Sequence, residues 1–235
     1  MIDVTAPPAR DRNDLAPGWH TALLVGLIVA VATAGSLLVE PSVPPPPANP
    51  GAWRLAMFAP LIVMQWGLVV YVARVGRRRW ALGALMGTRW PTARRAIVDV
   101  GCAAGVALLI VALESACSSF LSGRHGATVR ADLPHSAVAV AAWLVVALSV
   151  GFCEEVVYRG YLQKQLASVL RSPAVGCLGS AILFGVAHAE QGAAAAVRAG
   201  IYGLVLGATA HFRGSLIPGI LAHTSIDIAA GLVMR

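Results

Sequence analysis

Seven runs of apolar residues follow one another along this chain of 235 residues, and shorter polar or proline-rich segments separate them. The runs cover residues 20–39, 54–75, 96–116, 136–155, 174–188, 193–211 and 215–234. A helix of about 20 apolar residues crosses a hydrocarbon core of about 30 Å, and none of the runs alternates with the period of a barrel strand. The pattern predicts an all-α fold, a polytopic transmembrane helical bundle with about seven membrane spans.

The segments outside these runs suggest how the chain is organised. Residues 1–19 are expected to be a disordered cytoplasmic tail. Residues 20–135 hold the N-terminal membrane spans, with a proline-rich linker at 41–50 that cannot continue a helix and is expected on the external side of the membrane, opposite the cytoplasm. Residues 136–235 hold the last four spans and every motif discussed below.

Composition supports a membrane protein and argues against two other classes. Hydrophobic residues make up 57% of the chain and charged residues only 12%, whereas an ordinary soluble domain is about a quarter charged. The net charge is +7 and the sequence pI is about 9.9, but the arginines flank apolar runs and no aromatic-basic pattern accompanies them. No nucleic-acid partner is therefore expected, and contact with anionic membrane lipid explains the basic balance.

Arginine placement predicts how the chain is oriented. Many arginines follow the second apolar run, namely Arg74, Arg77, Arg78, Arg79, Arg89, Arg94 and Arg95. Short connections rich in Lys and Arg stay in the cytoplasm, so this connection and the N-terminus are expected on the cytoplasmic side. The expected location is the inner or plasma membrane of a bacterium.

Three polar motifs interrupt the apolar C-terminal part: Glu154-Glu155-x-x-x-Arg159, Phe184-x-x-x-His188 and His223-x-x-x-Asp227. An ionisable side chain at membrane depth costs several kcal/mol unless it meets a partner or water, so such residues indicate a functional site. Glu155 and Arg159 are four residues apart and can pair on one helical face, which leaves Glu154 as a free carboxylate suited to general-base work. The alternative is a structural Glu–Arg clamp at a helix end.

Hairpin geometry predicts that the motifs converge. Glu154 and His188 each lie 17 residues from Arg171, so an antiparallel turn at Ser172-Pro173 would put both about 25 Å from that turn. His223 follows Arg213 by ten residues, about 15 Å into the membrane. A single histidine on an apolar helix is often only an interhelical hydrogen-bonding group, but two histidines and a carboxylate at one depth favour a site.

The remaining motif residues are given supporting roles. Asp227 lies one helical turn after His223, where it can orient the imidazole and raise its basicity, or simply satisfy it. Phe184 is expected to pack against the site as an apolar wall.

The three motifs, in this order on successive apolar helices, resemble those of the CAAX-protease and bacteriocin-processing family, the type II CAAX prenyl endopeptidase-like or ABI family. The resemblance covers about residues 136–234, so residues 136–235 would form the catalytic membrane core. It implies an intramembrane endopeptidase that hydrolyses a peptide bond of a membrane-anchored protein or peptide, with a site open to the cytoplasm. Glu154 and His188 would activate water, His223 and Asp227 would stabilise the oxyanion, and Glu155, Arg159 and Phe184 would shape the site or contact substrate. The family motif often ends in Asn, so Asp227 departs from it.

Other interpretations remain open. The glutamic type of mechanism requires no cofactor and is favoured because the short His-Glu-x-x-His spacing of helical zinc proteases is missing. In a metallo-type enzyme, Glu154, His188 and His223 would hold Zn²⁺. A catalytically silent membrane protein that protects its host against a peptide toxin, binding a partner in the same cavity, is the alternative function. A proton-coupled transporter is weaker, because the inverted repeat of that class is missing.

Overall fold

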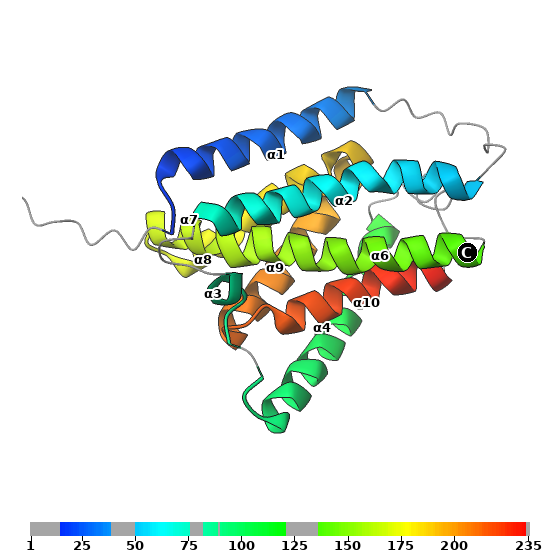
Figure 1. Cartoon of the computed structure of the whole chain (residues 1–235). Coiled ribbons are helices and arrows are strands. Elements are labelled where there is room, and N and C mark those ends of the chain that lie inside the picture. Colours follow the sequence, from blue (N-terminus) through cyan, green and yellow to red (C-terminus); the bar gives the residue numbers. More distant parts are fainter. Residues whose placement is uncertain (1–14, 39–49, 76–81, 89, 121–135, 234–235) are drawn as a thin grey trace, which may run out of the picture.

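The computed structural model describes residues 15–38, 50–75, 82–88, 90–120 and 136–233. Helices account for nearly all of these residues, and no β-strand occurs among them (Figure 1). The elements are α1 (Gly18–Leu38), α2 (Pro50–Val75), α3 (Leu82–Met86), α4 (Ala93–Phe120), α6 (Ala137–Glu154), the π-helix η2 (Glu155–Leu162), α7 (Gln163–Val169), α8 (Pro173–Ala187), the 3₁₀ turn η3 (Ala189–Gln191), α9 (Ala193–Arg213) and α10 (Ile217–Val233). The predicted all-α bundle is confirmed.

Each of the seven predicted apolar runs coincides with a helix, but the helices differ in length. Four described segments are long and apolar enough to cross a membrane: Gly18–Leu37, Ala93–Cys117, Ala137–Val169 and Ala193–Arg213. Three shorter apolar helical segments accompany them: Phe58–Arg74, Pro173–Ala187 and Ile217–Leu232. The long third segment arises because α6 continues through η2 into α7 without a break.

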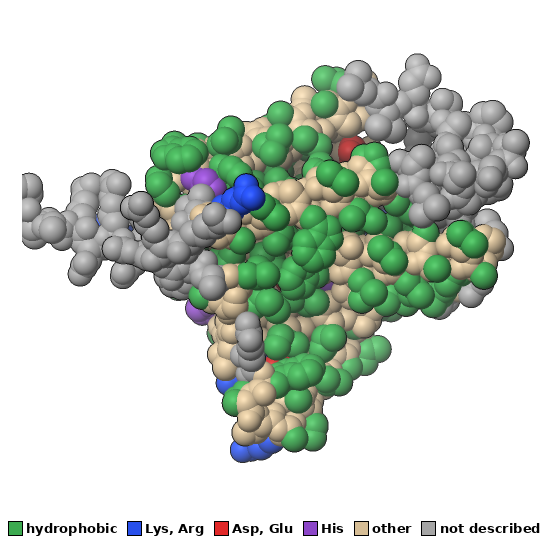
Figure 2. Space-filling model, in the orientation of Figure 1, with side chains coloured by type: hydrophobic (Ala, Val, Ile, Leu, Met, Phe, Trp, Pro, Cys, Tyr) green, Lys and Arg blue, Asp and Glu red, His purple; other side chains and the backbone are tan. Residues whose placement is uncertain are grey.

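The surface fits a protein surrounded by lipid. Apolar side chains cover much of the face shown in Figure 2, and large ones are exposed on helices from both halves of the chain, including Leu23, Val63, Leu108, Leu148 and Ile182. A soluble monomer rarely exposes so much contiguous apolar surface. The chain is an integral membrane protein by this criterion and by the length of its apolar helices.

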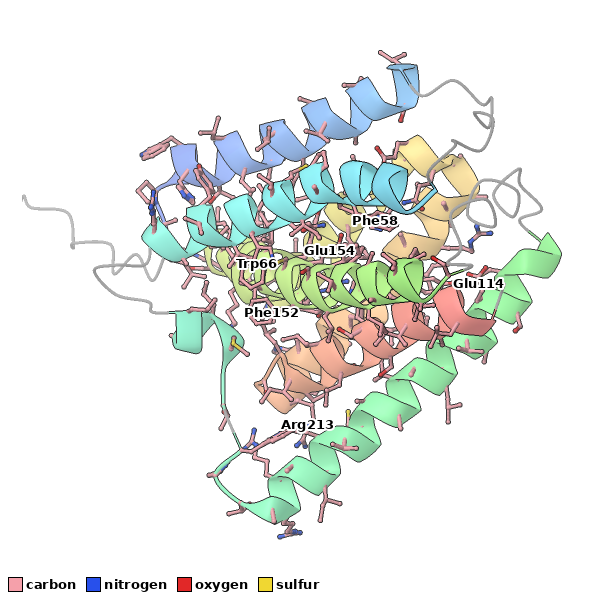
Figure 3. The ribbon with its side chains drawn as sticks, turned by 45° about the vertical axis from the view of Figure 1, so that its right-hand side comes forward. Phe58, Trp66, Glu114, Phe152, Glu154 and Arg213 are labelled. Carbon is pink, nitrogen blue, oxygen red and sulfur yellow. The ribbon has the colours of Figure 1, made fainter. Side chains whose placement is uncertain are left out.

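Packing within the bundle centres on the segment α6–η2–α7. Helix α2 and helix α10 both pack against α6, whereas α8 packs against α7 and α9. Helix α4 packs against α9 and α10 (Figures 1 and 3), and near its start Asp99 forms a salt bridge with Arg213 at the end of α9. The side chains of η2 therefore lie at the centre of the molecule, where all eight are buried.

Two local predictions about helix ends can be compared with the structure. Ser136, the first residue predicted for the fourth span, caps α6 by accepting a hydrogen bond from the backbone N–H of Ala139 at 3.2 Å. Ser172 caps α8 in the same way through Val175, and Pro173 occupies the first helical turn. The antiparallel turn predicted at Ser172-Pro173 is thus confirmed, and it joins α7 to α8.

The predicted disordered tail is wrong for its last residues. Residues 1–14 lie outside the described residues, but Gly18 and Trp19 belong to α1, and Ala16 is buried. The Gln165 side chain donates to the Ala16 carbonyl at 2.8 Å and accepts from the Ala16 N–H at 3.1 Å. These two bonds order the chain ahead of α1. The predicted linker at 41–50 also lies outside the described residues, except for Pro50, which begins α2.

Candidate active site

The first motif lies where α6 changes into the π-helix η2. Glu154 is the last residue of α6 and Glu155 is the first of η2. The wider turns of a π-helix are rare and often mark functional sites, because they re-aim side chains relative to a regular helix. Gly160 keeps this segment tightly packed, since a Cβ there would lie 3.1 Å from Leu216 and 3.3 Å from the Leu85 carbonyl oxygen.

Glu155 and Arg159 form the predicted pair, and it is completely buried. The distance from Arg159 Nη1 to Glu155 Oε1 is 2.8 Å, and neither side chain is exposed. The Arg159 guanidinium carbon also lies 4.3 Å from the centre of the Phe184 ring, a cation–π contact that partly replaces the water lost on burial. Phe184 itself is buried, in agreement with its predicted role as an apolar wall.

Glu154 has partners that the sequence analysis missed. Its Oε1 accepts a hydrogen bond of 2.7 Å from Gln65 Nε2 of α2, and its Oε2 lies 3.7 Å from His223 Nε2. Figure 3 shows Glu154 next to α2. The prediction that this carboxylate is free is wrong for Oε1. It holds for Oε2, which is buried and has no hydrogen-bond partner among the described residues.

A signal for Gln65 was present in the sequence. Gln65 is an uncharged polar residue in the middle of the apolar run 54–75, and it is buried in the structure. A polar amide within a membrane span needs a partner on another helix, so it could have been assigned to the site. The choice of Glu154 as its partner depends on how α2 packs against α6, which sequence spacing does not determine.

His223 stands among three carboxylates. Its Nδ1 lies 3.3 Å from Glu155 Oε1, and its Nε2 lies 3.6 Å from Asp227 Oδ2 in addition to its approach to Glu154. The predicted proximity of His223 and Asp227 on one helical face is confirmed. Because a carboxylate can only accept, an imidazole with carboxylates at both nitrogens is best satisfied as the doubly protonated imidazolium.

Two neighbours fix α10 in this position. Trp143 Nε1 of α6 donates a hydrogen bond of 2.8 Å to the backbone carbonyl of Asp227. Gly219 lets the helix approach the buried pair, because a Cβ there would come within 2.8 Å of Glu155 Oε2. Both contacts position the α10 residues relative to α6 and η2.

His188 lies beside this cluster and does not join it directly. It follows the last residue of α8, and its Nδ1 is 2.8 Å from the Phe184 carbonyl oxygen. A carbonyl only accepts, so Nδ1 carries the proton and Nε2 is left as an acceptor. The Phe184 ring lies 4.6 Å from the His188 ring and 6.0 Å from the His223 ring, centre to centre. No salt bridge joins His188 to Glu154 in the described part of the chain.

The predicted residues thus divide into two groups. Glu154, Glu155, Arg159, His223 and Asp227 form one connected cluster, and His188 is linked to it through the ring of Phe184. Within the described residues, no group of three or more His, Cys, Asp or Glu side chains is arranged to hold a metal ion. The trio named for Zn²⁺ therefore does not meet as a ligand set here.

The comparison with protein families agrees with the motifs. Residues 136–229 match the model described as type II CAAX prenyl endopeptidase Rce1-like, a range that contains all seven predicted site residues. The searches of curated proteins and of solved structures returned no significant match. Residues 136–229 are therefore similar to the type II CAAX prenyl endopeptidase family, in agreement with the resemblance of the three motifs.

Proposed function

We propose that this protein hydrolyses a peptide bond of a membrane-associated protein or peptide, with Glu154 as the general base. The observation that carries the proposal is the Oε2 atom of Glu154. It is buried, it has no hydrogen-bond partner among the described residues, and it lies 3.7 Å from a histidine nitrogen. An unsatisfied buried carboxylate oxygen is costly to a fold, and a water molecule held for reaction would satisfy it.

The charges of the cluster support this role. Glu154, Glu155 and Asp227 contribute up to three negative charges. Arg159 and a protonated His223 contribute two positive charges. If Arg159 balances Glu155 and His223 balances Asp227, one negative charge remains. A single ionised carboxylate with a hydrogen-bond donor at its other oxygen is the form that accepts a proton from water.

The proposed reaction begins with a water molecule between Glu154 and His188. Glu154 Oε2 takes a proton from this water, and His188 Nε2 accepts a hydrogen bond from it. The water oxygen attacks the carbonyl carbon of the scissile bond, whose oxygen becomes an oxyanion. Glu154 then gives its proton to the amide nitrogen as the C–N bond breaks. The products are a carboxylic acid and a free amine, and Glu154 returns to its ionised form.

His223 is the proposed donor to the oxyanion. Such a donor is effective when it is held in place beforehand, in a site from which water is excluded. Asp227, 3.6 Å from His223, cannot itself donate while ionised. We therefore assign Asp227 the role of holding His223 as an imidazolium, and Glu155, Arg159 and Phe184 the role of shaping the site.

The proposed mechanism is of the glutamic type and needs no metal ion. It is supported by Glu154 Oε2, which is buried without a partner among the described residues and so suits a bound water, and by the missing His-Glu-x-x-His spacing of helical zinc proteases. Extensive dialysis against a strong chelator should leave hydrolysis intact. Loss of hydrolysis, with recovery on addition of Zn²⁺, would contradict this part of the proposal.

The proposed substrate class is supported by the family. The family acts on membrane-associated prenylated proteins, and we propose a membrane-anchored protein or peptide as substrate, without requiring a prenyl group. We place the site open to the cytoplasm, because the arginine-rich connection after the second span is expected there.

A comparison of membrane proteomes tests the proposal in cells. Cells with the intact protein, with Glu154→Ala and with Glu114→Ala are compared for C-terminally trimmed membrane proteins. Glu114 is the matched control, because it is a helical acid paired with Arg198 away from the cluster. Trimming should disappear only with Glu154→Ala. If Glu154→Ala keeps the phenotype of the intact protein, a binding role such as protection against a peptide toxin is favoured instead.

A further inference from the structure

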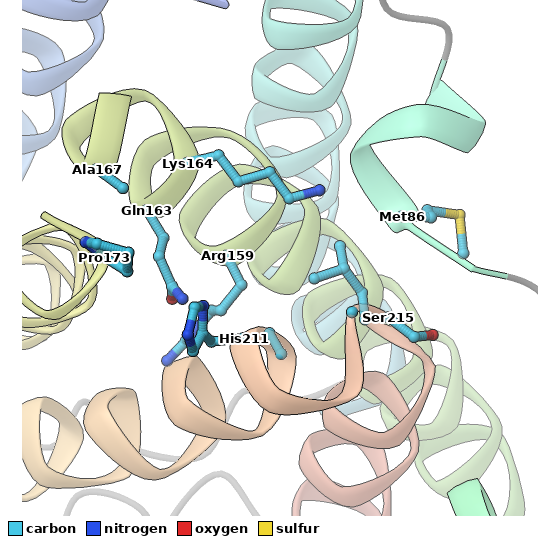
Figure 4. Close-up of a pocket in the computed structure, with 11 residues that line it drawn as sticks. Met86, Arg159, Gln163, Lys164, Ala167, Pro173, His211 and Ser215 are labelled. Carbon is cyan, nitrogen blue, oxygen red and sulfur yellow. The ribbon is translucent and has the colours of Figure 1, made fainter. Parts of the chain in front are cut away.

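A second polar space lies beside Arg159, outside the cluster of the candidate active site. The cavity has a volume of about 170 Å³, and none of the described residues that line it is acidic. Its walls come from η2, α7, the start of α8, the end of α9, the turn before α10, and α3 (Figure 4). One bound water molecule needs only about 10–15 Å³ of such space, so the cavity has room for a polar group of several heavy atoms.

Arg159 supplies hydrogen-bond donors that have no partner in this space. Its Nη1 is bound to Glu155, but Nε and Nη2 are buried and have no hydrogen-bond partner among the described residues. The residue is only 1% exposed, and a buried donor without a partner is costly to the fold. Guanidinium donors pair well with phosphate or carboxylate oxygens. A ligand with such oxygens would satisfy Arg159 from the cavity.

Lys164 makes the cavity electropositive. Its Nζ donates to the backbone carbonyls of Leu85 at 2.8 Å and Ala84 at 3.3 Å, and to no acid in the part of the chain that the structure describes. An ammonium group has three donors, so one remains for a ligand. Arg159 is already balanced by Glu155 at 2.8 Å, so the uncompensated charge beside the cavity is that of Lys164. The site therefore favours an anion with a single negative charge, such as a phosphodiester.

Gln163 adds an unsatisfied acceptor. Its Nε2 donates to the Gly207 carbonyl at 2.9 Å, and its Oε1 is buried without a partner among the described residues. Figure 4 shows the side chains of Arg159, Gln163 and His211 coming together. Phosphodiester oxygens only accept, so Oε1 needs a donor from another part of the same ligand. The polar groups thus suit a phosphate ester that also carries a hydroxyl group.

The place of the cavity in the fold favours a lipid as the carrier of this phosphate. The continuous segment Ala137–Val169 has 33 residues, about 50 Å at 1.5 Å per residue, whereas a hydrocarbon core is about 30 Å thick. Its last turns, in α7, therefore extend to the headgroup region. Large apolar side chains are exposed on the elements that form the cavity walls or directly after them, namely Leu170, Val175 and Phe212. Such side chains suit the acyl chains of a bound lipid.

We infer that this cavity binds the headgroup of an anionic phospholipid that has a free headgroup hydroxyl, as phosphatidylglycerol has. Its phosphate accepts from Arg159 and Lys164, and a headgroup hydroxyl donates to Gln163 Oε1. The lipid comes from the cytoplasmic leaflet, because the arginine-rich connection that precedes α3 is expected on that side. The inference does not depend on the proposed function, since it concerns lipid binding alone.

Lipid binding to the full-length protein tests the inference. The protein in a neutral detergent is titrated with phosphatidylglycerol or with phosphatidylcholine of the same acyl chains, and bound lipid is counted by native mass spectrometry. Phosphatidylglycerol should bind at least about tenfold more tightly. The reason is that choline has no donor for Gln163 and brings a positive charge toward Lys164. Equal binding of the two lipids overturns the inference and leaves the cavity to water.

Two pairs of variants locate the effect. Lys164→Gln removes the charge but keeps a donor for the Leu85 carbonyl, and should weaken phosphatidylglycerol binding at least about tenfold. Its control, Arg94→Gln, removes an exposed charge on the same side of the membrane and should leave binding unchanged. Ala210→Phe fills the cavity and should abolish the lipid preference, whereas Leu204→Phe enlarges an exposed side chain on the same helix and should keep it.

The charge pair also gives the result that would refute a specific site. Equal losses of binding in Lys164→Gln and Arg94→Gln overturn the inference, because general attraction of anionic lipid to a basic surface then explains the binding. If Ala210→Phe does not fold, the charge pair decides alone.

Inorganic phosphate distinguishes a lipid headgroup from a free phosphate. Added in large excess, it should leave phosphatidylglycerol bound, because it lacks acyl chains to contact the exposed apolar side chains. Displacement of the lipid would assign the cavity to a soluble phosphate and overturn the inference. Hydrolysis is measured in none of these experiments, so the endopeptidase proposal stands or fails separately.

Discussion

Gln65 provides a direct probe of how the fold prepares Glu154. Gln65→Met keeps the length of the side chain and removes the N–H group that lies 2.7 Å from Glu154 Oε1. Both side chains are buried, so no bulk water replaces the lost donor. A hydrogen bond to a charged group contributes about 1.5–3 kcal/mol, which corresponds to roughly 10- to 150-fold in rate at about 1.4 kcal/mol per factor of ten. We expect kcat to fall by that factor, because Glu154 loses the hydrogen-bond donor that orients its carboxylate.

The assay is steady-state hydrolysis of a quenched fluorescent peptide in proteoliposomes, with kcat and KM determined separately. Trp66→Phe is the matched control, because Trp66 Nε1 donates to Ser149 Oγ at 3.4 Å and so also links α2 to α6, but outside the cluster. The control should keep its kcat, and both variants should keep their melting temperature within a few degrees. If Gln65→Met leaves kcat unchanged, or if the control loses as much, Gln65 does not act through Glu154.

Three further predictions concern the residues around the cluster. Gly151→Ala places a methyl group against α10 and should destabilise the protein by about 1–3 kcal/mol. Gly101→Ala is the control and should not destabilise it, because a Cβ at Gly101 would meet no atom within 4 Å. Equal melting temperatures of the two variants would contradict the close approach of α6 to α10. Arg159→Met removes the 2.8 Å partner of the buried Glu155 carboxylate, which then keeps only His223 at 3.3 Å, and should cost about 3–5 kcal/mol of unfolding free energy. Adding Glu155→Gln should restore part of it, and a double variant no more stable than Arg159→Met would speak against the pair. Asp227→Asn should keep kcat within about tenfold of the natural protein, because an amide oxygen can still accept a hydrogen bond from the imidazole. Removal of a catalytic acid or base lowers kcat by about 100- to 10,000-fold, and a loss of that size would mean that Asp227 takes part in proton transfer.

Local features of the site could be predicted from the sequence because helical geometry fixes them. Residues four apart on a helix lie on one face, and both predicted pairs, Glu155 with Arg159 and His223 with Asp227, are close in the structure. The turn at Ser172 was predictable for a similar reason, since a capping side chain followed by proline marks a helix start.

Features that depend on packing between distant helices could not be predicted in this way. The bond from Gln65 to Glu154 joins residues 89 positions apart, and it depends on the rotation of α2 relative to α6. The hydrogen bond of His188 Nδ1 to the Phe184 carbonyl depends on where α8 ends, which the spacing of the motifs does not determine. The π-helical turns of η2 also have no local signature in a sequence read only for apolar periodicity.

The central claim is that Glu154 activates water for hydrolysis, and its most direct test is single-turnover cleavage by purified protein in proteoliposomes. Glu154→Gln keeps the shape of the side chain but removes its ability to accept a proton. The account predicts that this variant binds the peptide with unchanged affinity and cleaves it at least about 100-fold more slowly. Cleavage at the rate of the natural protein would contradict the account.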